Sequence, residues 1–225
     1  MTPRHHLPDD LLMAHASGVA SRGVDVLVTA HLVLCPGCRG RVAELEALGG
    51  AVLDDAPPAA LDSGLLDGIM GRLNEGEPPL THPPATDDGR ADAVLPSGLV
   101  LPRPIRELVL ETDAAWKTVV PGLLHQLPLP VKVGEMPLRL IRLRSGFVVP
   151  NHTHRGIEIN LVLSGGYHDE DQEFERGDVQ VSDEEVTHSL QIDPGEDCVL
   201  LAVNDSPLVP VGFMSKIAKL ITGNM

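Results

Sequence analysis

Residues 146–165 read GFVVPNHTHRGIEINLVLSG, and this stretch predicts a metal site together with a β-strand at 157–163. From Ile157 to Leu163 the odd positions are apolar while Glu158 is polar, which is the period-two pattern of a strand. Side chains two positions apart on a strand point to the same face, so His152, His154 and Glu158 share one face. Burying imidazoles together with a carboxylate costs free energy unless they bind something, and a metal ion satisfies both.

His188, further along the chain, is expected to supply a fourth ligand from a neighbouring strand. Three histidines and one carboxylate suit zinc, iron, manganese or nickel, and the residue types do not choose between these ions. We expect a divalent metal in this set, with zinc as the preferred ion.

The rest of the C-terminal half also reads as short strands bounded by turn residues. Strands are predicted at 138–143, 178–182, 189–192 and 198–203. Regular short strands without helices between them indicate an antiparallel sandwich or barrel.

The N-terminal part of the chain has a different pattern. Residues 76–97 are rich in proline and poor in apolar side chains, so they are predicted to form a flexible linker. Before this linker, residues 1–75 read as helices, with the third expected at 39–48 because Gly49 and Gly50 follow it. No aromatic residue precedes Trp116, and a small helical bundle without rings needs a metal, a disulfide or a partner to fold.

A second ligand pattern lies in this helical part. His31 and Cys35 share one face of a helix, and Cys38 completes a Cys-x-x-Cys turn that can close on one ion. Structural zinc takes four tetrahedral nitrogen or sulfur ligands, so one more histidine is required. His6, just before the first helix, is our preferred fourth ligand. The alternatives are two further histidines in the same region, His5 and His15.

The Cys-Pro-Gly-Cys turn has a competing interpretation as a thioredoxin-type redox pair. That motif belongs beside a strand of a βαβ unit, and no such unit is predicted here. Cys198 is separate from this pattern, and two interpretations of it stay open: a buried small hydrophobe, or an oxidisable thiol near the second metal.

Composition narrows the class of protein. The net charge of −15 and the pI near 4.9 argue against direct nucleic-acid binding. No apolar run approaches the roughly 18 residues of a membrane span, and the first residues lack the apolar core of a signal peptide. Three cysteines are too few for a disulfide framework, so we expect a cytoplasmic protein.

Two family resemblances follow from these residues. The His-x3-Cys-x2-Cys pattern behind an N-terminal histidine resembles the zinc-binding anti-sigma domain of bacteria. The spacing Gly146-x5-His152-x-His154-x3-Glu158-x6-Gly165 matches the first cupin motif at every signature position. The second cupin motif is only partly kept, with Asp183 and Glu185 where the family usually has Pro and Gly.

The order of these two domains resembles the ChrR-type anti-sigma factors. The resemblance implies an α+β protein of two domains: a zinc-held all-α bundle over residues 1–75 and, after the linker, a cupin-like antiparallel β-barrel over 98–225. It implies that the protein sequesters an extracytoplasmic-function (group IV) sigma factor, regulates transcription and responds to oxidative stress such as singlet oxygen. It also implies two metal sets, Zn2+ on His6, His31, Cys35 and Cys38, and a divalent metal on His152, His154, Glu158 and His188.

The resemblance predicts a binding protein and not an enzyme. The alternative is a cupin metalloenzyme, oxygenase-like, whose N-terminal domain serves for docking. Only the metal ligands favour turnover, because the sequence offers no convincing second acid–base group.

Overall fold

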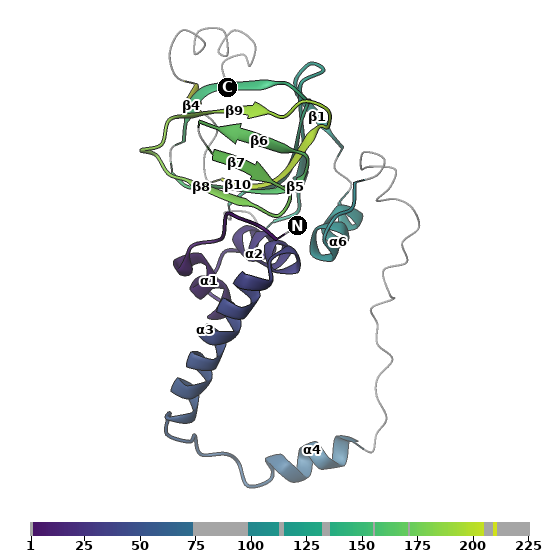
Figure 1. Cartoon of the computed structure of the whole chain (residues 1–225). Helices are drawn as coiled ribbons and strands as arrows, with labels where there is room; N and C mark the ends of the chain where they lie inside the picture. The colour runs from purple at the N-terminus through teal and green to yellow at the C-terminus, as the bar shows by residue number, and fades with distance from the viewer. Residues whose placement is uncertain are drawn as a thin grey trace.

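The computed structural model describes residues 2–73, 99–112, 115–131, 136–154, 156–170 and 172–204, together with the backbone of 209–210. Within these residues helices come first and antiparallel strands follow, as the sequence predicts (Figure 1). The predicted linker at 76–97 lies outside the described residues.

The helices are α1 (Asp9–Ala16), α2 (Arg22–Leu34), α3 (Pro36–Asp54), α4 (Leu65–Leu73) and α6 (Arg103–Glu111). Two acidic residues, Asp9 and Asp10, occupy the first turn of α1, where they complement the helix dipole. Cys35 lies outside the helical range and caps α3, because its sulfur accepts from the backbone N–H of Cys38 over 3.4 Å. Pro36 follows at the first position of α3, where its missing N–H has no consequence.

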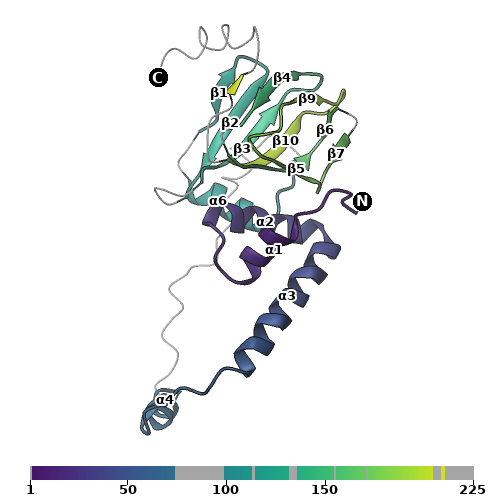
Figure 2. The ribbon, with the colours of Figure 1, turned by 90° about the vertical axis from the view of Figure 1, so that its left-hand side faces the viewer.

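The predicted end of the third helix at Leu48 is wrong. α3 continues through Gly49 and Gly50 to Asp54. A glycine in an exposed helix interior costs only about 1 kcal/mol relative to alanine, which does not terminate a helix by itself. In Figures 1 and 2, α3 extends away from the strands and α4 lies at its far end.

The strands form two separate antiparallel sheets. The first has the order β1-β2-β3-β10-β5-β8 and the second the order β11-β4-β9-β6-β7. The bounds are β1 (Lys117–Val120), β2 (Leu124–Leu129), β3 (Leu138–Leu143), β4 (Val148–Thr153), β5 (Glu158–Ser164), β6 (Gly166–Asp169), β7 (Gln172–Glu175), β8 (Val179–Ser182), β9 (His188–Ile192), β10 (Cys198–Asn204) and β11 (Val209–Pro210). Across the described residues the strands therefore do not form the single closed barrel that the resemblance implied (Figure 2).

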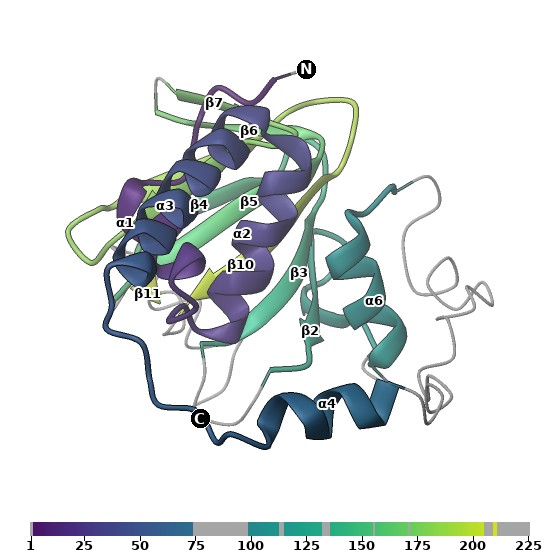
Figure 3. The same ribbon diagram turned by 90° about the horizontal axis from the view of Figure 1, so that it is seen from below.

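Buried apolar side chains lie on both faces of the first sheet. Val162 and Leu200 of that sheet pack with Tyr167 and Ile192 of the second sheet, which fills the space between the two. On the outer face, Leu161 belongs to a larger cluster that includes residues of α2 and α6. Figure 3 shows α2 lying over β10 with α6 beside it. Helices α2 and α6 and the first sheet thus share one apolar core.

Nowhere in the part of the chain that the structure describes is there a helix long and apolar enough to cross a membrane.

Two candidate metal centres

The first group of ligand-type side chains, here called the thiolate centre, lies where the N-terminal segment meets α2 and α3. It consists of His6, His31, Cys35 and Cys38, whose ligand atoms all lie within 4.8 Å of one another. Nε2 of His31 is 3.3 Å from Sγ of Cys38, and Nδ1 of His6 is 3.2 Å from Sγ of Cys35 and 3.6 Å from Sγ of Cys38. A tetrahedral zinc site with ordinary bond lengths has ligand–ligand edges of about 3.3–3.8 Å, so this donor set fits zinc.

Burial explains why the thiolate centre needs a cation. Removal from water raises the pKa of the Cys38 thiol to about 11 and lowers the pKa of His31 to about 4. His31 is therefore neutral and can offer a lone pair, whereas the Cys38 thiol would stay protonated without a positive charge beside it. A bound zinc ion supplies that charge and holds cysteine as thiolate.

The orientation of His31 is fixed from the sheet side. Its Nδ1 donates to the backbone carbonyl oxygen of Gly177 over 2.9 Å. This hydrogen bond places the proton on Nδ1 and leaves Nε2 free to face Cys38, as second partners of metal-binding histidines commonly do. No local spacing in the sequence indicates this contact, because it joins positions 146 residues apart.

The structure brings His6 to the cysteines and places the other two histidines elsewhere. Nε2 of His5 donates to the carbonyl oxygen of Glu173 over 3.0 Å, and its ring lies 4.3 Å from that of Phe174. His15 hydrogen-bonds Asp25 through Nδ1 over 2.6 Å.

The second group, here called the histidine centre, lies between the two sheets. Glu158 begins β5 of the first sheet, His152 and His188 belong to β4 and β9 of the second, and His154 follows β4 directly. All four side chains are buried, and their ligand atoms lie within 4.8 Å of one another. Nε2 of His154 is 3.0 Å from Nε2 of His188 and 3.3 Å from Oε2 of Glu158.

Outer hydrogen bonds orient these ligands inward. His152 donates from Nδ1 to the carbonyl oxygen of Pro150 over 2.8 Å, and His188 donates from Nδ1 to Oδ2 of Asp169 over 2.6 Å. Each ring therefore keeps Nε2 for the centre. The amide of Asn160 donates to Oε2 of Glu158 over 3.0 Å.

The charges of the histidine centre also indicate a cation. Burial lowers the pKa of His152, and burial raises the pKa of Glu158. A divalent ion held by the three imidazoles and this carboxylate would offset the desolvation of Glu158. The donor set fits the ion; it does not by itself distinguish zinc from iron, manganese or nickel.

A second layer of polar residues supports His188. Asp169 also accepts from Nε2 of Gln180, and Oε1 of Gln180 accepts from the hydroxyl of Tyr167 over 2.8 Å. Sequence reasoning missed Asp169 and Gln180. Only their placement on strands β6 and β8 brings them to β9, and no spacing rule reports that placement.

The departures from the second cupin motif leave His188 in place. Asp183 closes the turn before it, because its Oδ1 accepts from the N–H of Glu185 over 3.0 Å and its carbonyl oxygen from the N–H of Val186 over 3.3 Å. An aspartate thus forms the turn where the motif usually has proline and glycine.

Cys198 matches the buried-hydrophobe interpretation. It begins β10 with no exposed surface and packs in the core between the sheets. Burial raises the pKa of its thiol, so it lacks thiolate character.

Comparison with known proteins identifies a cupin-like domain in the C-terminal half and relatives among anti-sigma factors. Residues 106–208 match the family model described as the ChrR cupin-like domain. The chain is 36% identical over 222 residues to the anti-sigma-E factor ChrR of Cereibacter sphaeroides, which covers 97% of this chain and 98% of that protein. It is also similar to a crystal structure of Rhodobacter sphaeroides SigE in complex with the anti-sigma ChrR, with a TM-score of 0.72, 35% identity, and coverage of 91% of this chain and 100% of that chain.

Proposed function

The chain belongs to the family of ChrR anti-sigma factors, and from that membership we propose that it sequesters an extracytoplasmic-function (group IV) sigma factor. The binding is steric: helices of the N-terminal part cover the surface through which the sigma factor would contact RNA polymerase. The protein thereby regulates transcription in the cytoplasm without turning over a substrate.

The observation that carries this proposal is an apolar surface on α4 and the end of α3, here called the helical apolar surface. No side chain of α4 is buried. Large apolar side chains on these two helices are between 46% and 73% exposed, namely Leu48, Val52, Leu53, Leu65, Leu66, Ile69, Met70 and Leu73. Exposed apolar surface of this kind marks a protein interface, and short amphipathic helices commonly bind in grooves of a partner.

Zinc in the thiolate centre would hold these helices in position. His6 precedes α1, His31 lies in the last turn of α2, and the two cysteines flank the start of α3. One ion therefore joins three helices, and such sites contribute on the order of 10 kcal/mol to folding. We propose a zinc-held domain over residues 1–75, a linker over 76–97 and a cupin domain over 98–225.

The histidine centre is proposed to sense the signal, oxidative stress such as singlet oxygen. A divalent ion held by His152, His154, Glu158 and His188 supplies a positive charge between the two sheets. Oxidation of a ligand around the bound ion would change the packing between the two sheets, and a centre that lacks the ion would not respond. The donor set also occurs in cupin enzymes such as oxygenases, which makes a metalloenzyme the second candidate.

A sigma-dependent reporter, measured with and without a singlet-oxygen source, tests this function. The wild-type chain is expected to keep the reporter off in the dark. Under singlet oxygen it is expected to release the sigma factor, which turns the reporter on. Glu158→Gln is expected to keep the reporter off in both conditions, because the sensor ion is lost while the helical apolar surface remains. His125→Ala changes a histidine of β2 outside both centres, and is expected to respond like the wild type.

The anti-sigma role and the sensing role are contradicted by different results. A reporter that stays on in the dark with the wild-type chain contradicts the anti-sigma role. A full response by Glu158→Gln contradicts the sensing role of the histidine centre.

A further inference from the structure

The N-terminal segment that carries His6 is fastened to the turn between β7 and β8. Oδ1 of Asp178 accepts from the backbone N–H groups of Arg4 and His5 over 2.6 and 3.0 Å. The N–H of Val179 in turn donates to the carbonyl oxygen of His5 over 3.2 Å. This turn thus positions two ligands of the thiolate centre. Asp178 binds the backbone of residues 4 and 5, directly before His6, and the Gly177 carbonyl accepts from His31.

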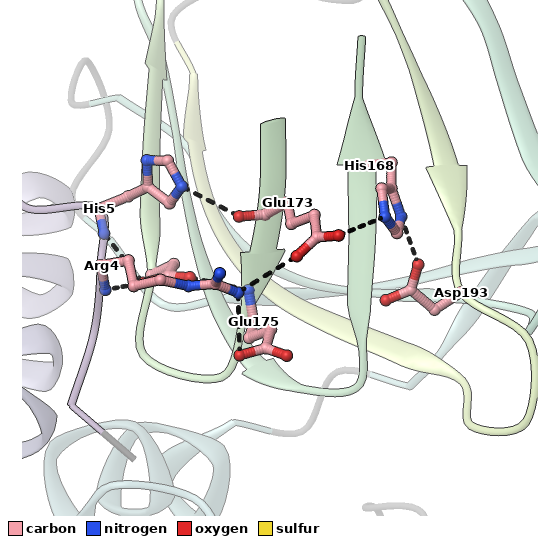
Figure 4. Close-up of polar contacts among 7 residues, drawn as sticks. Arg4, His5, His168, Glu173, Glu175 and Asp193 are labelled. Carbon is pink, nitrogen blue, oxygen red and sulfur yellow. Dashed lines mark hydrogen bonds and ion pairs between the residues drawn. The ribbon is translucent and has the colours of Figure 1, made fainter. Parts of the chain in front are cut away.

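Charged side chains extend the same contact, as Figure 4 shows. The guanidinium of Arg4 lies 3.5 Å from Oε2 of Glu173 and 3.2 Å from Oε2 of Glu175. Nε2 of His5 donates to the carbonyl oxygen of Glu173. The segment therefore meets β7 as well as the turn.

The other end of the same stretch supports the histidine centre. Gln180, two positions after Asp178, donates to Oδ2 of Asp169, and the same oxygen accepts from Nδ1 of His188. Residues 177–180 therefore connect to both centres: the Gly177 carbonyl accepts from His31 at one end, and Gln180 at the other end donates to Asp169, the partner of His188.

We propose that residues 177–180 couple the two metal centres, so that emptying the histidine centre weakens metal binding at the thiolate centre. The coupling rests on the two metal sites of the proposed function, but it does not require a sigma factor. It is reciprocal: emptying the thiolate centre weakens the histidine centre by the same factor.

The physical reason lies in the short distances inside the histidine centre. Nε2 of His188 is 3.0 Å from Nε2 of His154, and Oε2 of Glu158 is 3.3 Å from the same nitrogen. A cation holds these atoms together, and its loss leaves them buried and desolvated, so the ligands must rearrange. A shift of His188 moves its hydrogen-bond partner Asp169, and Asp169 in turn moves Gln180, which donates to it. Through the backbone, a shift of Gln180 moves the Gly177 carbonyl.

The structure leaves space for this movement. A pocket of about 620 Å³ is lined by His6 and His188, the two ligands that face it from the two centres, and by side chains of β8 including Gln180. The β8 segment is therefore not enclosed by packing on this side.

Cobalt provides a readout that separates the two centres. Thiolate ligands give bound Co2+ a charge-transfer band in the near ultraviolet, which a site of nitrogen and oxygen ligands lacks. The affinity of the thiolate centre is measured from this band by competition with a chelator, on the full chain without sigma factor. Glu158→Gln, which removes a ligand of the histidine centre while keeping its shape, is expected to weaken cobalt binding at the thiolate centre by about tenfold.

Substitutions at two glycines test the contact between residues 177–180 and the N-terminal segment, one as the variant and one as its control. Gly177 has φ +97°, and a Cβ there would lie 2.9 Å from Cγ of Pro3, so Gly177→Ala pushes the N-terminal segment away. Gly195 has φ +106° with no heavy atom within 4 Å of its Cβ position, so Gly195→Ala adds the same backbone strain without that clash. Asp178→Ala removes the acceptor of Arg4 and His5 without backbone strain, and serves as a second interface variant.

The outcomes decide the proposal. We expect the tenfold effect of Glu158→Gln to persist in the Gly195→Ala background and to vanish in the Gly177→Ala and Asp178→Ala backgrounds. An unchanged cobalt affinity in Glu158→Gln alone would overturn the coupling. The same tenfold effect in both interface variants would overturn the path through residues 177–180. Neither result bears on whether the chain binds a sigma factor.

Discussion

The carbonyl oxygen of Gly177 accepts a hydrogen bond from Nδ1 of His31 over 2.9 Å. Gly177 lies in the turn before β8, and His31 lies in the last turn of α2. A backbone group of the sheets thus orients a ligand of the thiolate centre. The helical part and the sheets are joined at the site where metal is expected, in addition to the apolar core that they share.

Asp169→Asn is expected to weaken metal binding at the histidine centre. The carboxylate of Asp169 accepts from Nδ1 of His188, and loss of such an outer partner typically costs 10–100-fold in metal affinity. Chelator competition on the purified chain measures this change. Asp197→Asn is the control, because Asp197 accepts from the N–H of Ser145 and pairs with Arg142. Equal affinities in the two variants would contradict the role given to Asp169.

His168→Gln is expected to remove a pH-dependent part of the stability. The hydrogen bond to Asp193 raises the pKa of His168 above its usual 6.5, and Glu173 adds to the effect. Because the pKa is higher in the folded state, protonated His168 stabilises the folded protein, and this contribution to the free energy of unfolding is fully present below about pH 6.5. It disappears as the pH rises through the pKa of the folded state. The pair is exposed, so the difference is a few tenths of a kcal/mol.

Thermal unfolding of the wild type and His168→Gln at pH 6 and pH 8.5 checks this sign. The unfolding temperature of the wild type should be higher than that of the variant at pH 6. The two unfolding temperatures should converge at pH 8.5. A gap that widens with pH would show that His168 is not held protonated by Asp193.

Ile69→Glu on α4 is expected to weaken sigma binding without unfolding the chain. Ile69 is 49% exposed and packs in no core cluster, so the free energy of unfolding should change by less than about 0.5 kcal/mol. A charge placed inside an apolar interface should lower affinity at least about tenfold, or about 1.4 kcal/mol. Arg72→Ala, on the same helix, is the control for a general change in α4. Equal sigma affinities in Ile69→Glu and the wild type would contradict the assignment of the helical apolar surface.

Much of this molecule can be predicted from local pattern. Period-two alternation from Ile157 to Leu163 predicts a strand, and β5 occupies Glu158–Ser164. The strand prediction succeeds because neighbours along a strand set it. The parity argument for the ligands does not hold, because His152 lies on β4 and Glu158 on β5, in different sheets. The structure brings these side chains together with His154 and His188 between the two sheets.

What the sequence could not supply is the contact between distant segments. The apolar pattern of Val24 to Leu34 shows that a helix has a buried face, but it does not show that the face packs on a sheet. Burial of Leu27 and Val28 in one cluster with Leu161 and Val203 shows that it does. The contacts of Gly177 and Asp178 with the N-terminal segment have the same origin, because no local spacing predicts them.

The central claim is that a zinc-held helical part binds an extracytoplasmic-function sigma factor. Its most direct test is a calorimetric titration of the purified zinc-loaded chain with an extracytoplasmic-function sigma factor from the same genome, using the wild type, Cys38→Ala and Cys198→Ala. The account predicts a one-to-one complex for the wild type and for Cys198→Ala, whose thiol is buried away from both centres. Cys38→Ala should lose its zinc and bind at least about 100-fold more weakly, since zinc supplies folding free energy to the helices. Two results would contradict the claim: zinc-free Cys38→Ala that binds the sigma factor with wild-type affinity, or a wild-type chain that forms no complex with it.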